Sequence, residues 1–422
     1  MFRINHQYWI GQVSRGLFTG LLTGLAITLY SFLIFTAGQI NAMYPFLILF
    51  IPAAALLTQQ LYKRFGEKFR ASTVSAIDDI NNHRRMHKNW AQSQVPESIS
   101  PALAALAAAG ALLTHLTGAS GGKEGAGVQV GLACSSVIEK AEAFANSRLK
   151  REHDNRSDYY LMCGAGAAFS SLFASPVAGV LFGTQLASPR ATRLDAYLPC
   201  MTASFTSYLV SSSLGCHILT IPDYSPLPLE PASMFKVALF ALLTGLYARL
   251  FCFALRSFRS FFQKHIKNSS LAIAAPALLL LASSLAVFYF TGSFRYNGLG
   301  GSLLEQLILG QANNIDDLIK LVMVALTYAA GFVGGEVVPL MIVGAGFGMS
   351  MSFVFNAPLS AFAVLGSIGM LSGGTNLPLV CFALGLELYS YSEPALLFLM
   401  CCLSFIASGK NGIYSHQNLP YR

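Results

Sequence analysis

Charged residues are scarce in this sequence. Only 11% of its 422 residues are Asp, Glu, Lys or Arg, 54% are hydrophobic, and the mean hydropathy is +0.55. A soluble protein carries about a quarter charged residues. The charges stand in clusters, and the runs between them carry few: 16–62, 102–120, 232–255, 269–290, 320–350 and 358–408. This scarcity excludes an ordinary soluble domain and indicates an all-α integral membrane protein.

The lengths of these runs predict the shape of the helices. About 20 apolar residues cross a bilayer core of about 30 Å. Several runs are longer than one span or contain Gly and Pro, so we expect paired and broken helices. A backbone group left unpaired in lipid costs several kcal/mol, so such breaks must be buried in protein or line a watery cavity.

A surface for nucleic acid is not expected, although the formal net charge is +8. The basic residues lie in the connections between apolar runs. By the positive-inside rule these connections face the cytoplasm, and we expect both termini there, in the inner (plasma) membrane. The clusters are Lys63, Arg64, Lys68 and Arg70; Arg84, Arg85 and Lys88; Arg148, Lys150, Arg151 and Arg156; and Arg249, Arg256, Arg259, Lys264 and Lys267.

The segment 216–231 has no Lys or Arg and is rich in Pro, so we expect it on the extracytoplasmic side. It separates two parts of similar length. We therefore take 1–215 as a first membrane repeat and 232–422 as a second. Only about a dozen residues follow Ser408, so we expect no cytoplasmic regulatory domain.

Patterns of metal and catalytic chemistry are also missing. The eight cysteines have no metal-ligand spacing, and most lie inside apolar runs, where Cys usually acts as a small hydrophobic residue. The sequence contains no HExxH, no Asp-rich metal motif and no Gly-x-Ser-x-Gly elbow. We therefore expect no cofactor, no metal site and no enzyme.

Short sequence patterns of the first half recur in the second half. Residues 175–185 and 376–387 each place a Pro-marked break between a Gly/Ala-rich stretch and another apolar stretch. Residues 121–131 and 334–348 each open with glycines, contain one acid and lead into small apolar residues. Weak symmetry with interrupted segments at matching places is typical of inverted-repeat transporters, whose sites lie near the midplane. Chance likeness among Gly/Ala-rich helices is the alternative.

Gly122, Lys123, Glu124 and Gly125 form the most informative motif. Glycines let a helix start approach a ligand closely, with backbone N–H groups that have no partner inside the helix. Such a start carries about half a positive charge and holds anions. A carboxylate at this place competes with the anion and leaves when it is protonated. The motif thus indicates a gate at Glu124; an interfacial Lys–Glu pair is the alternative.

The stretch 334–339 (GGEVVP) has the same features, glycines and one acid at an expected helix start. Pro339 is tolerated near a helix start, where its missing N–H would have no partner. The glycines before it allow the backbone amides of Val337 and Val338 to face a cavity. Glu336 is a second acid within an apolar run, so it is either a stop for protons or a structural acid at the start of a helix.

Two weaker signals remain. Tyr414, after the last apolar run, can donate one hydrogen bond to an anion, although a tyrosine there often belongs to the interfacial belt. Ser72 or Thr73 can cap a helix start, and their hydroxyl or amide groups can also face an anion.

These motifs resemble those of the CLC family of chloride channels and anion/proton antiporters, over nearly the whole chain. The family has Gly-Lys/Arg-Glu-Gly-Pro followed by a helix similar to the one that begins here. The resemblance implies a many-helix inverted-repeat fold and a homodimer with one pathway in each subunit. It also implies that Glu124 is the gating glutamate, that the amides of Val337 and Val338 form the central anion site, and that Tyr414 supplies the hydroxyl at its inner end.

The sequence departs from chloride-transporting members at three places. The first filter motif, Gly-Ser-Gly-Ile-Pro, reads ASTVS at 71–75, and the usual Phe of Gly-x-Phe-x-Pro is Val337. The inner proton-transfer glutamate falls near Gln185 and Leu186, and neither side chain ionises.

A fourth departure resembles the fluoride/proton antiporter branch of the family. That branch has the Gly-Gly-Glu-Val pattern seen at Glu336 and lacks the inner glutamate. It usually has Thr where this chain has Val338, and a Met or Asn where it has Ser72. The larger relatives carry regulatory cystathionine-synthase-like domains, and this sequence has none.

The sequence therefore predicts anion transport across a lipid bilayer, coupled to protons through Glu124, with fluoride favoured over chloride. Passive chloride conduction through the same fold is the alternative. Because Gln185 cannot carry protons, Glu336 is the candidate for their inner route.

Overall fold

The computed structural model describes residues 6–65, 77, 78, 80, 81, 99–148, 157–189, 194–216, 219–414, 416, 417 and 419. The predicted site residues Ser72 and Thr73 lie outside these ranges, as do many of the basic residues in the connections. The described part is almost wholly helical. Its one isolated β-bridge joins Gly122 to Gly335.

The first half begins with two long helices joined by a short 3-10 turn. They correspond to the apolar run 16–62, which confirms the expected pairing and break. The helices and turns of this half are α1 (His6–Met43), η1 (Pro45–Phe50), α2 (Ile51–Phe65), α4 (Pro101–Leu116), α5 (Glu124–Arg148), α6 (Ser157–Phe173), α7 (Pro176–Gln185), η4 (Leu194–Ala196) and α8 (Tyr197–Ser213).

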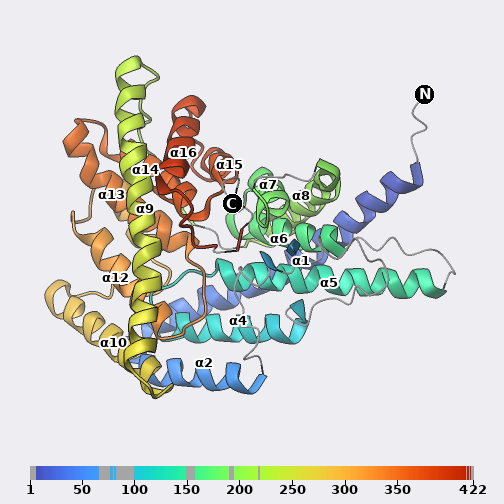
Figure 1. Cartoon of the computed structure of the whole chain (residues 1–422), viewed down its shortest axis with the longest axis horizontal. Helices are drawn as coiled ribbons and strands as arrows, with labels where there is room; N and C mark the ends of the chain where they lie inside the picture. The colour runs from blue at the N-terminus through green and yellow to red at the C-terminus, as the bar shows by residue number, and fades with distance from the viewer. Residues whose placement is uncertain are drawn as a thin grey trace.

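The second half follows the helix-free stretch before Pro231. Figure 1 shows its long α9 running along one side of the molecule, beside α10, α12 and α14. The helices are α9 (Pro231–His265), α10 (Leu271–Thr291), α11 (Gly301–Ile308), α12 (Asp316–Ala329), α13 (Val337–Phe355), α14 (Leu359–Thr375), α15 (Pro378–Leu388) and α16 (Pro394–Ser408).

The helices differ widely in length. In the described parts of the chain, five segments are long and apolar enough to cross a membrane: Trp9–Met43, Pro45–Phe65, Pro231–His265, Leu271–Thr291 and Val337–Phe355. Other apolar helices have only 10–17 residues. At about 1.5 Å per residue these cannot cross a core of about 30 Å alone, so their ends lie inside the protein. Short helices that end at mid-depth place backbone N–H groups where a site can use them.

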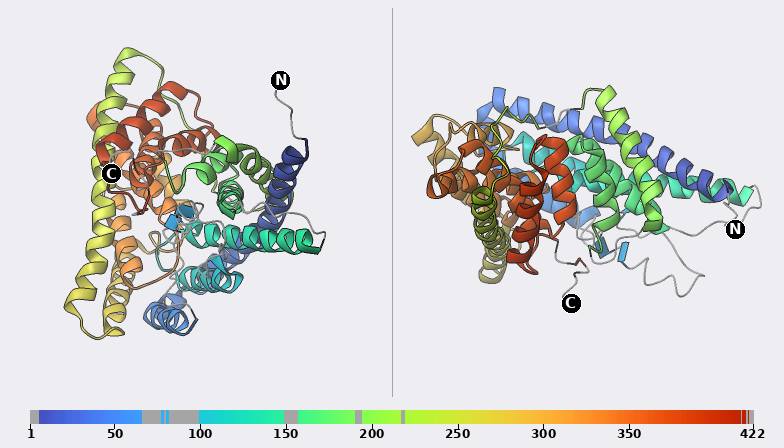
Figure 2. Two further views of the ribbon diagram at one scale, coloured as in Figure 1. Left: turned by 45° about the vertical axis from the view of Figure 1, so that its right-hand side comes forward. Right: turned by 90° about the horizontal axis from the view of Figure 1, so that it is seen from above.

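The two halves repeat one packing scheme. In the first half α5 packs on α6, α6 on α7 and α8, and α8 on α1; in the second, α13 packs on α14, α14 on α15 and α16, and α16 on α9. Contacts of α2 with α4 and of α10 with α12 continue the parallel. Figure 2 shows the halves as two groups side by side. We propose on this basis that 1–215 and 232–422 are the two repeats.

Close backbone contacts also repeat between the halves. A Cβ added to Gly131 of α5 would lie 2.3 Å from the carbonyl oxygen of Gly164 of α6, and one on Gly344 of α13 would lie 2.4 Å from that of Gly366 of α14. Only glycine permits such distances. Small residues at crossings are the usual way to pack membrane helices tightly. They hold α5 and α13, whose first residues are the predicted site residues.

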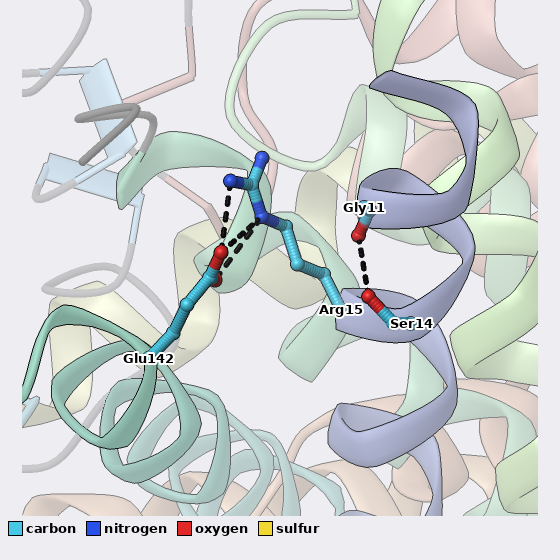
Figure 3. A network of polar contacts seen from close by, with 4 residues as sticks. All are labelled: Gly11, Ser14, Arg15 and Glu142. Atoms are coloured by element: carbon cyan, nitrogen blue, oxygen red, sulfur yellow. Dashed lines mark hydrogen bonds and ion pairs between the residues drawn. The ribbon is translucent and has the colours of Figure 1, made fainter. Parts of the chain in front are cut away.

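An ion pair joins α1 to α5 far from the start of α5. Figure 3 shows Arg15 of α1 reaching across to Glu142 of α5, while Ser14 bonds to Gly11 within α1. The Arg15 Nη2 atom lies 3.0 Å from Glu142 Oε1, and both side chains are partly buried. The pair ties the end of α5 to α1, and Glu124 stands at the opposite end.

Candidate functional site

The carboxylate of Glu124 is buried and has no hydrogen-bond partner among the residues that the structure describes. Glu124 is the first residue of α5 and only 2% exposed. Neither of its carboxylate oxygens accepts a hydrogen bond from a residue that the structure describes. Buried polar atoms are nearly always paired, so an orphaned carboxylate indicates a functional group or a place for water or an ion. The Glu124 side chain is therefore the centre of the candidate site.

The surroundings of this carboxylate are backbone amides. The N–H groups of Lys123, Glu124 and Val338 lie close enough to stabilise its negative charge. Glu124 and Val338 belong to the first turns of different helices, α5 and α13. The positive ends of two helices thus face one carboxylate, the arrangement that holds anions at helix starts.

A short backbone bridge joins the two helix starts. The Gly122 N–H donates to the Gly335 carbonyl at 2.8 Å, and the Gly335 N–H donates to the Gly122 carbonyl at 2.9 Å. Two tyrosines reinforce it. The hydroxyl of Tyr328 donates to the Gly335 carbonyl at 2.6 Å, and that of Tyr30 donates to the Lys123 carbonyl at 2.8 Å. The two similar stretches 121–131 and 334–348 therefore contact each other through this bridge.

Glycine is required on both sides of the bridge because the Glu124 carboxylate fills the space. A Cβ on Gly122 would lie 2.1 Å from Glu124 Oε2, and one on Gly335 would lie 2.5 Å from the same atom. A Cβ on Gly125 would lie 2.3 Å from the Gly334 carbonyl oxygen. The motif glycines therefore allow the two chains to approach each other and the carboxylate to lie between them.

Glu336 is a second acid near Glu124. It is the residue before α13 and is partly buried. Its charge interacts with the charges of both Glu124 and Arg259. Arg259 belongs to one of the basic clusters of the sequence, between Arg249 and Lys267. Glu336 is therefore close enough to Glu124 for the two acids to influence each other.

Tyr414 lies near both acids of the candidate site, Glu124 and Glu336. It is 5% exposed and lies within electrostatic range of both Glu124 and Glu336. The Ile413 N–H donates to the Gly374 carbonyl at 2.7 Å, which fixes this segment against the end of α14. Such burial differs from an interfacial belt position, the alternative that the sequence left open.

Lys123 lines a cavity beside the start of α5. It is 6% exposed, and its ammonium group donates to Ser31 Oγ of α1 at 3.4 Å. His115, at the end of α4, lines the same cavity. Within the described ranges, no group of three or more His, Cys, Asp or Glu side chains could hold a metal ion.

Sequence reasoning did not find Tyr30, Tyr328 or His115. Each is a polar side chain inside an apolar helix and buried or half-buried by other helices. A tyrosine in the middle of a long apolar run, as Tyr30 is, departs from the belt positions near membrane surfaces, and that departure could have identified it.

Buried helix starts that meet around one carboxylate, inside a protein of many membrane helices, define an anion-transport protein. The chain belongs to the CLC family, as its residues 53–409 match the family model described as "Voltage gated chloride channel". This confirms the resemblance seen in the sequence.

A Chloride/fluoride channel protein of Pseudomonas syringae pv. tomato (strain ATCC BAA-871 / DC3000) is 28% identical over 403 residues, 95% of this chain and 85% of the relative. The fold is similar to a crystal structure of a CLC-type fluoride/proton antiporter, with a TM-score of 0.85, 23% identity and coverage of 98% and 99% of the two chains. A slow cyanobacterial Cl⁻/H⁺ antiporter gives a TM-score of 0.74 at 16% identity, with 96% of each chain covered. The predicted all-α CLC-type fold is confirmed.

Proposed function

We propose that this chain exchanges fluoride for protons across the inner membrane, with Glu124 as the group for which anion and proton compete. The observation that carries the proposal is the buried Glu124 carboxylate, which has no hydrogen-bond partner in the described structure and faces the amides of two helix starts. Helix starts in this position stabilise a halide as they stabilise a carboxylate. The protein is then a transporter and not an enzyme.

The competition has a simple electrostatic basis. While Glu124 is ionised, its carboxylate occupies the place that the Val338 amide faces, and an anion is excluded by charge and by volume. When a proton neutralises the carboxyl group, its attraction to the helix starts falls and the side chain can leave. One anion and one proton therefore use the same place in turn. Tyr414 supplies a hydroxyl donor nearby, and Ser72 and Thr73 remain candidates at the inner end.

Protons need an inner route that Gln185 does not supply. Gln185 is buried near the end of α7, and its side chain cannot ionise. Glu336 interacts with both Glu124 and Arg259, so we propose it as the proton carrier on the cytoplasmic side. An ionisable group within a membrane segment is a functional candidate by default.

Replacing Glu336 by Gln should uncouple the two fluxes. Glutamine keeps the shape of the side chain but cannot take up a proton. We expect proton flux to fall by about a hundredfold, the size of effect that a positioned acid or base supplies, while anion flux persists. A pH dye and an anion-selective electrode on the same proteoliposomes measure both. Glu305→Gln, which changes an acid of α11 that is not among the predicted site residues, is the control. An unaltered ratio of fluxes in Glu336→Gln would return Glu336 to a structural role.

The choice of anion is tested by efflux from proteoliposomes loaded with fluoride or chloride at equal gradients. We expect fluoride to leave faster, because the chain has the Gly-Gly-Glu-Val pattern and the named relative from Pseudomonas syringae carries fluoride as well as chloride in its description. Faster chloride efflux would assign the chain to chloride. Anion efflux without any proton movement would favour the passive channel, the alternative reading of a chain without an inner acid at Gln185.

We also propose the arrangement in the membrane. The basic connections and both termini lie in the cytoplasm, the segment 216–231 lies outside, and two copies form a homodimer with one pathway each. Arg249, Arg256 and Lys264 cluster beside one end of α9, whereas the connection before Pro231 has no basic residue. Labelling of single introduced cysteines from each side of intact cells tests the orientation, and crosslinking in the membrane tests the dimer.

A further inference from the structure

A groove with a volume of about 870 Å³ runs along the C-terminal half of α9. Figure 2 shows this helix at the edge of the molecule. The wall of the groove comes from α9 and, on one side, from Asn411 in the connection after α16. Side chains that recur every three or four residues lie on one face of a helix, and the groove follows such a face. We call it the α9 groove; the residues of that face are Leu246, Leu250, Phe253, Ser257, Ser260 and Lys264.

The α9 groove is apolar toward the middle of the helix and polar toward its end. Leu246, Leu250 and Phe253 form the apolar part, and all three side chains are exposed. Arg256 begins the polar part, which ends at Lys264 in the last turn of α9. The helix rises about 15 Å from Leu246 to Arg256, half the thickness of a bilayer core of about 30 Å. The acyl chains of one leaflet therefore match the apolar part in length, and the head groups of that leaflet reach the polar part.

Three basic side chains of the groove have no acidic partner in the described structure. Arg249, Arg256 and Lys264 line the groove, no Asp or Glu is among the described residues of its wall, and none of the three forms an ion pair within the described ranges. The Arg256 Nε atom donates to the Cys252 carbonyl at 3.1 Å, which holds the guanidinium group beside the groove. Arg249 lies two turns before Arg256, and a long basic side chain at that depth extends its charge toward the membrane surface. The three positive charges are thus available to a ligand outside the chain.

The chemistry of the groove matches an anionic phospholipid. Exposed apolar side chains of a membrane helix contact acyl chains, and basic pockets at the cytoplasmic side of membrane helices bind acidic head groups. The hydroxyl groups of Ser257 and Ser260 can donate further hydrogen bonds to a phosphate group. A free inorganic anion would use the polar part alone, and an acidic soluble protein would not reach the apolar part within the bilayer. A ligand with both a negative head group and an apolar chain uses the whole groove.

We propose that the α9 groove binds one anionic phospholipid of the cytoplasmic leaflet. The phosphate group lies between Arg256 and Lys264, and one acyl chain lies along Leu246, Leu250 and Phe253. The leaflet follows from the proposed orientation of the chain, in which the basic connections face the cytoplasm. The lipid site itself does not depend on which anion the chain transports or on how that transport is coupled to protons.

The test compares two lipids on the purified full chain in detergent. Phosphatidylglycerol, which carries a negative charge, and phosphatidylcholine, which has no net charge, are titrated separately, and native mass spectrometry counts the bound lipids. Each basic side chain beside an anionic head group contributes about fivefold in affinity, so we expect the first phosphatidylglycerol to bind about a hundredfold more tightly than the first phosphatidylcholine. In Arg249→Gln/Lys264→Gln this preference should fall to about fivefold, because one cation remains.

The matched control is Lys140→Gln/Arg148→Gln, which removes the same charge from exposed positions on α5, outside the groove. It should keep the native preference for phosphatidylglycerol. Lys264→Gln alone serves if the double groove variant does not fold, since it changes one exposed side chain in the last turn of α9. It should lower the preference by about fivefold.

An unchanged preference in the groove variants would overturn the proposal. An equal loss in the α5 control would also overturn it, because the preference would then reflect the overall surface charge. Displacement of phosphatidylglycerol by glycerol 3-phosphate at equal concentration would indicate a site for free phosphate instead of a lipid. Disulfide-linked dimers formed through Phe253→Cys would show that a second copy covers the groove. A chain that prefers phosphatidylglycerol as expected but moves no anion contradicts the proposed function alone, so the two failures are distinguishable.

Discussion

Glu124→Gln is expected to abolish proton movement and leave anion flux. Glutamine has nearly the size and shape of glutamate, so the joined starts of α5 and α13 should keep their geometry. Its amide cannot take up a proton, and it carries no charge with which to compete for the helix starts. We expect proton flux to fall to the background of empty liposomes, a loss of about a hundredfold or more for a proton-transferring group. A pH dye and a fluoride or chloride electrode on the same vesicles measure the two fluxes.

The control for this variant is Glu142→Gln on the same helix. Glu142 pairs with Arg15 where both are partly solvated, so its loss costs about 1 kcal/mol or less. It should leave both fluxes near native. If Glu124→Gln still moves protons at the native ratio to anions, Glu124 is not the gate, whatever the orientation of its side chain.

Much of the fold could be predicted from the sequence because membrane helices leave strong local signals. Apolar runs, Pro-marked breaks and the basic connections are read directly, and the split of 16–62 into α1 and α2 was expected. The short helices were only partly predictable. A stretch such as 376–387 shows where a break lies, but whether its helix ends inside the protein depends on what packs around it.

The candidate site was predictable as far as its motif glycines and acids. The importance of Gly122, Gly335 and Glu124 is visible in the local sequence, because a close approach of two backbones needs glycine. The direction in which a side chain points depends on the helices packed around it and not on its neighbours in the sequence. Lys123 reaches Ser31 of α1, whereas the Glu124 carboxylate lies near the Val338 amide of α13, and no pattern within 121–131 decides this.

The tyrosine hydrogen bonds show the same limit. Tyr30 and Tyr328 lie 93 and 7 residues from the carbonyl groups that they bind. Pairing over the longer distance is decided by the packing of α1 on α5. It could not be deduced from a single sequence, although polar groups buried in apolar runs must find such partners.

Gly335→Ala is expected to stop both fluxes. An added Cβ would lie 2.5 Å from Glu124 Oε2, 2.6 Å from the Gly125 nitrogen and 2.8 Å from the Glu124 nitrogen. Two of these three atoms are backbone, so the strain is not relieved by turning a side chain. The two hydrogen bonds between Gly122 and Gly335 must lengthen, and the starts of α5 and α13 must separate. The amides of α5 and α13 that now lie near the Glu124 carboxylate would then no longer face the same point.

We expect anion and proton flux to fall together by about a hundredfold, as displacement by about an ångström does at preorganised sites. Gly11→Ala is the control, since a Cβ there has nothing within 4 Å. Size-exclusion profiles and thermal unfolding of both purified variants separate a damaged site from a damaged fold. Coupled transport at the native rate in Gly335→Ala would contradict the proposed site, because the starts of α5 and α13 could then separate without consequence for the anion.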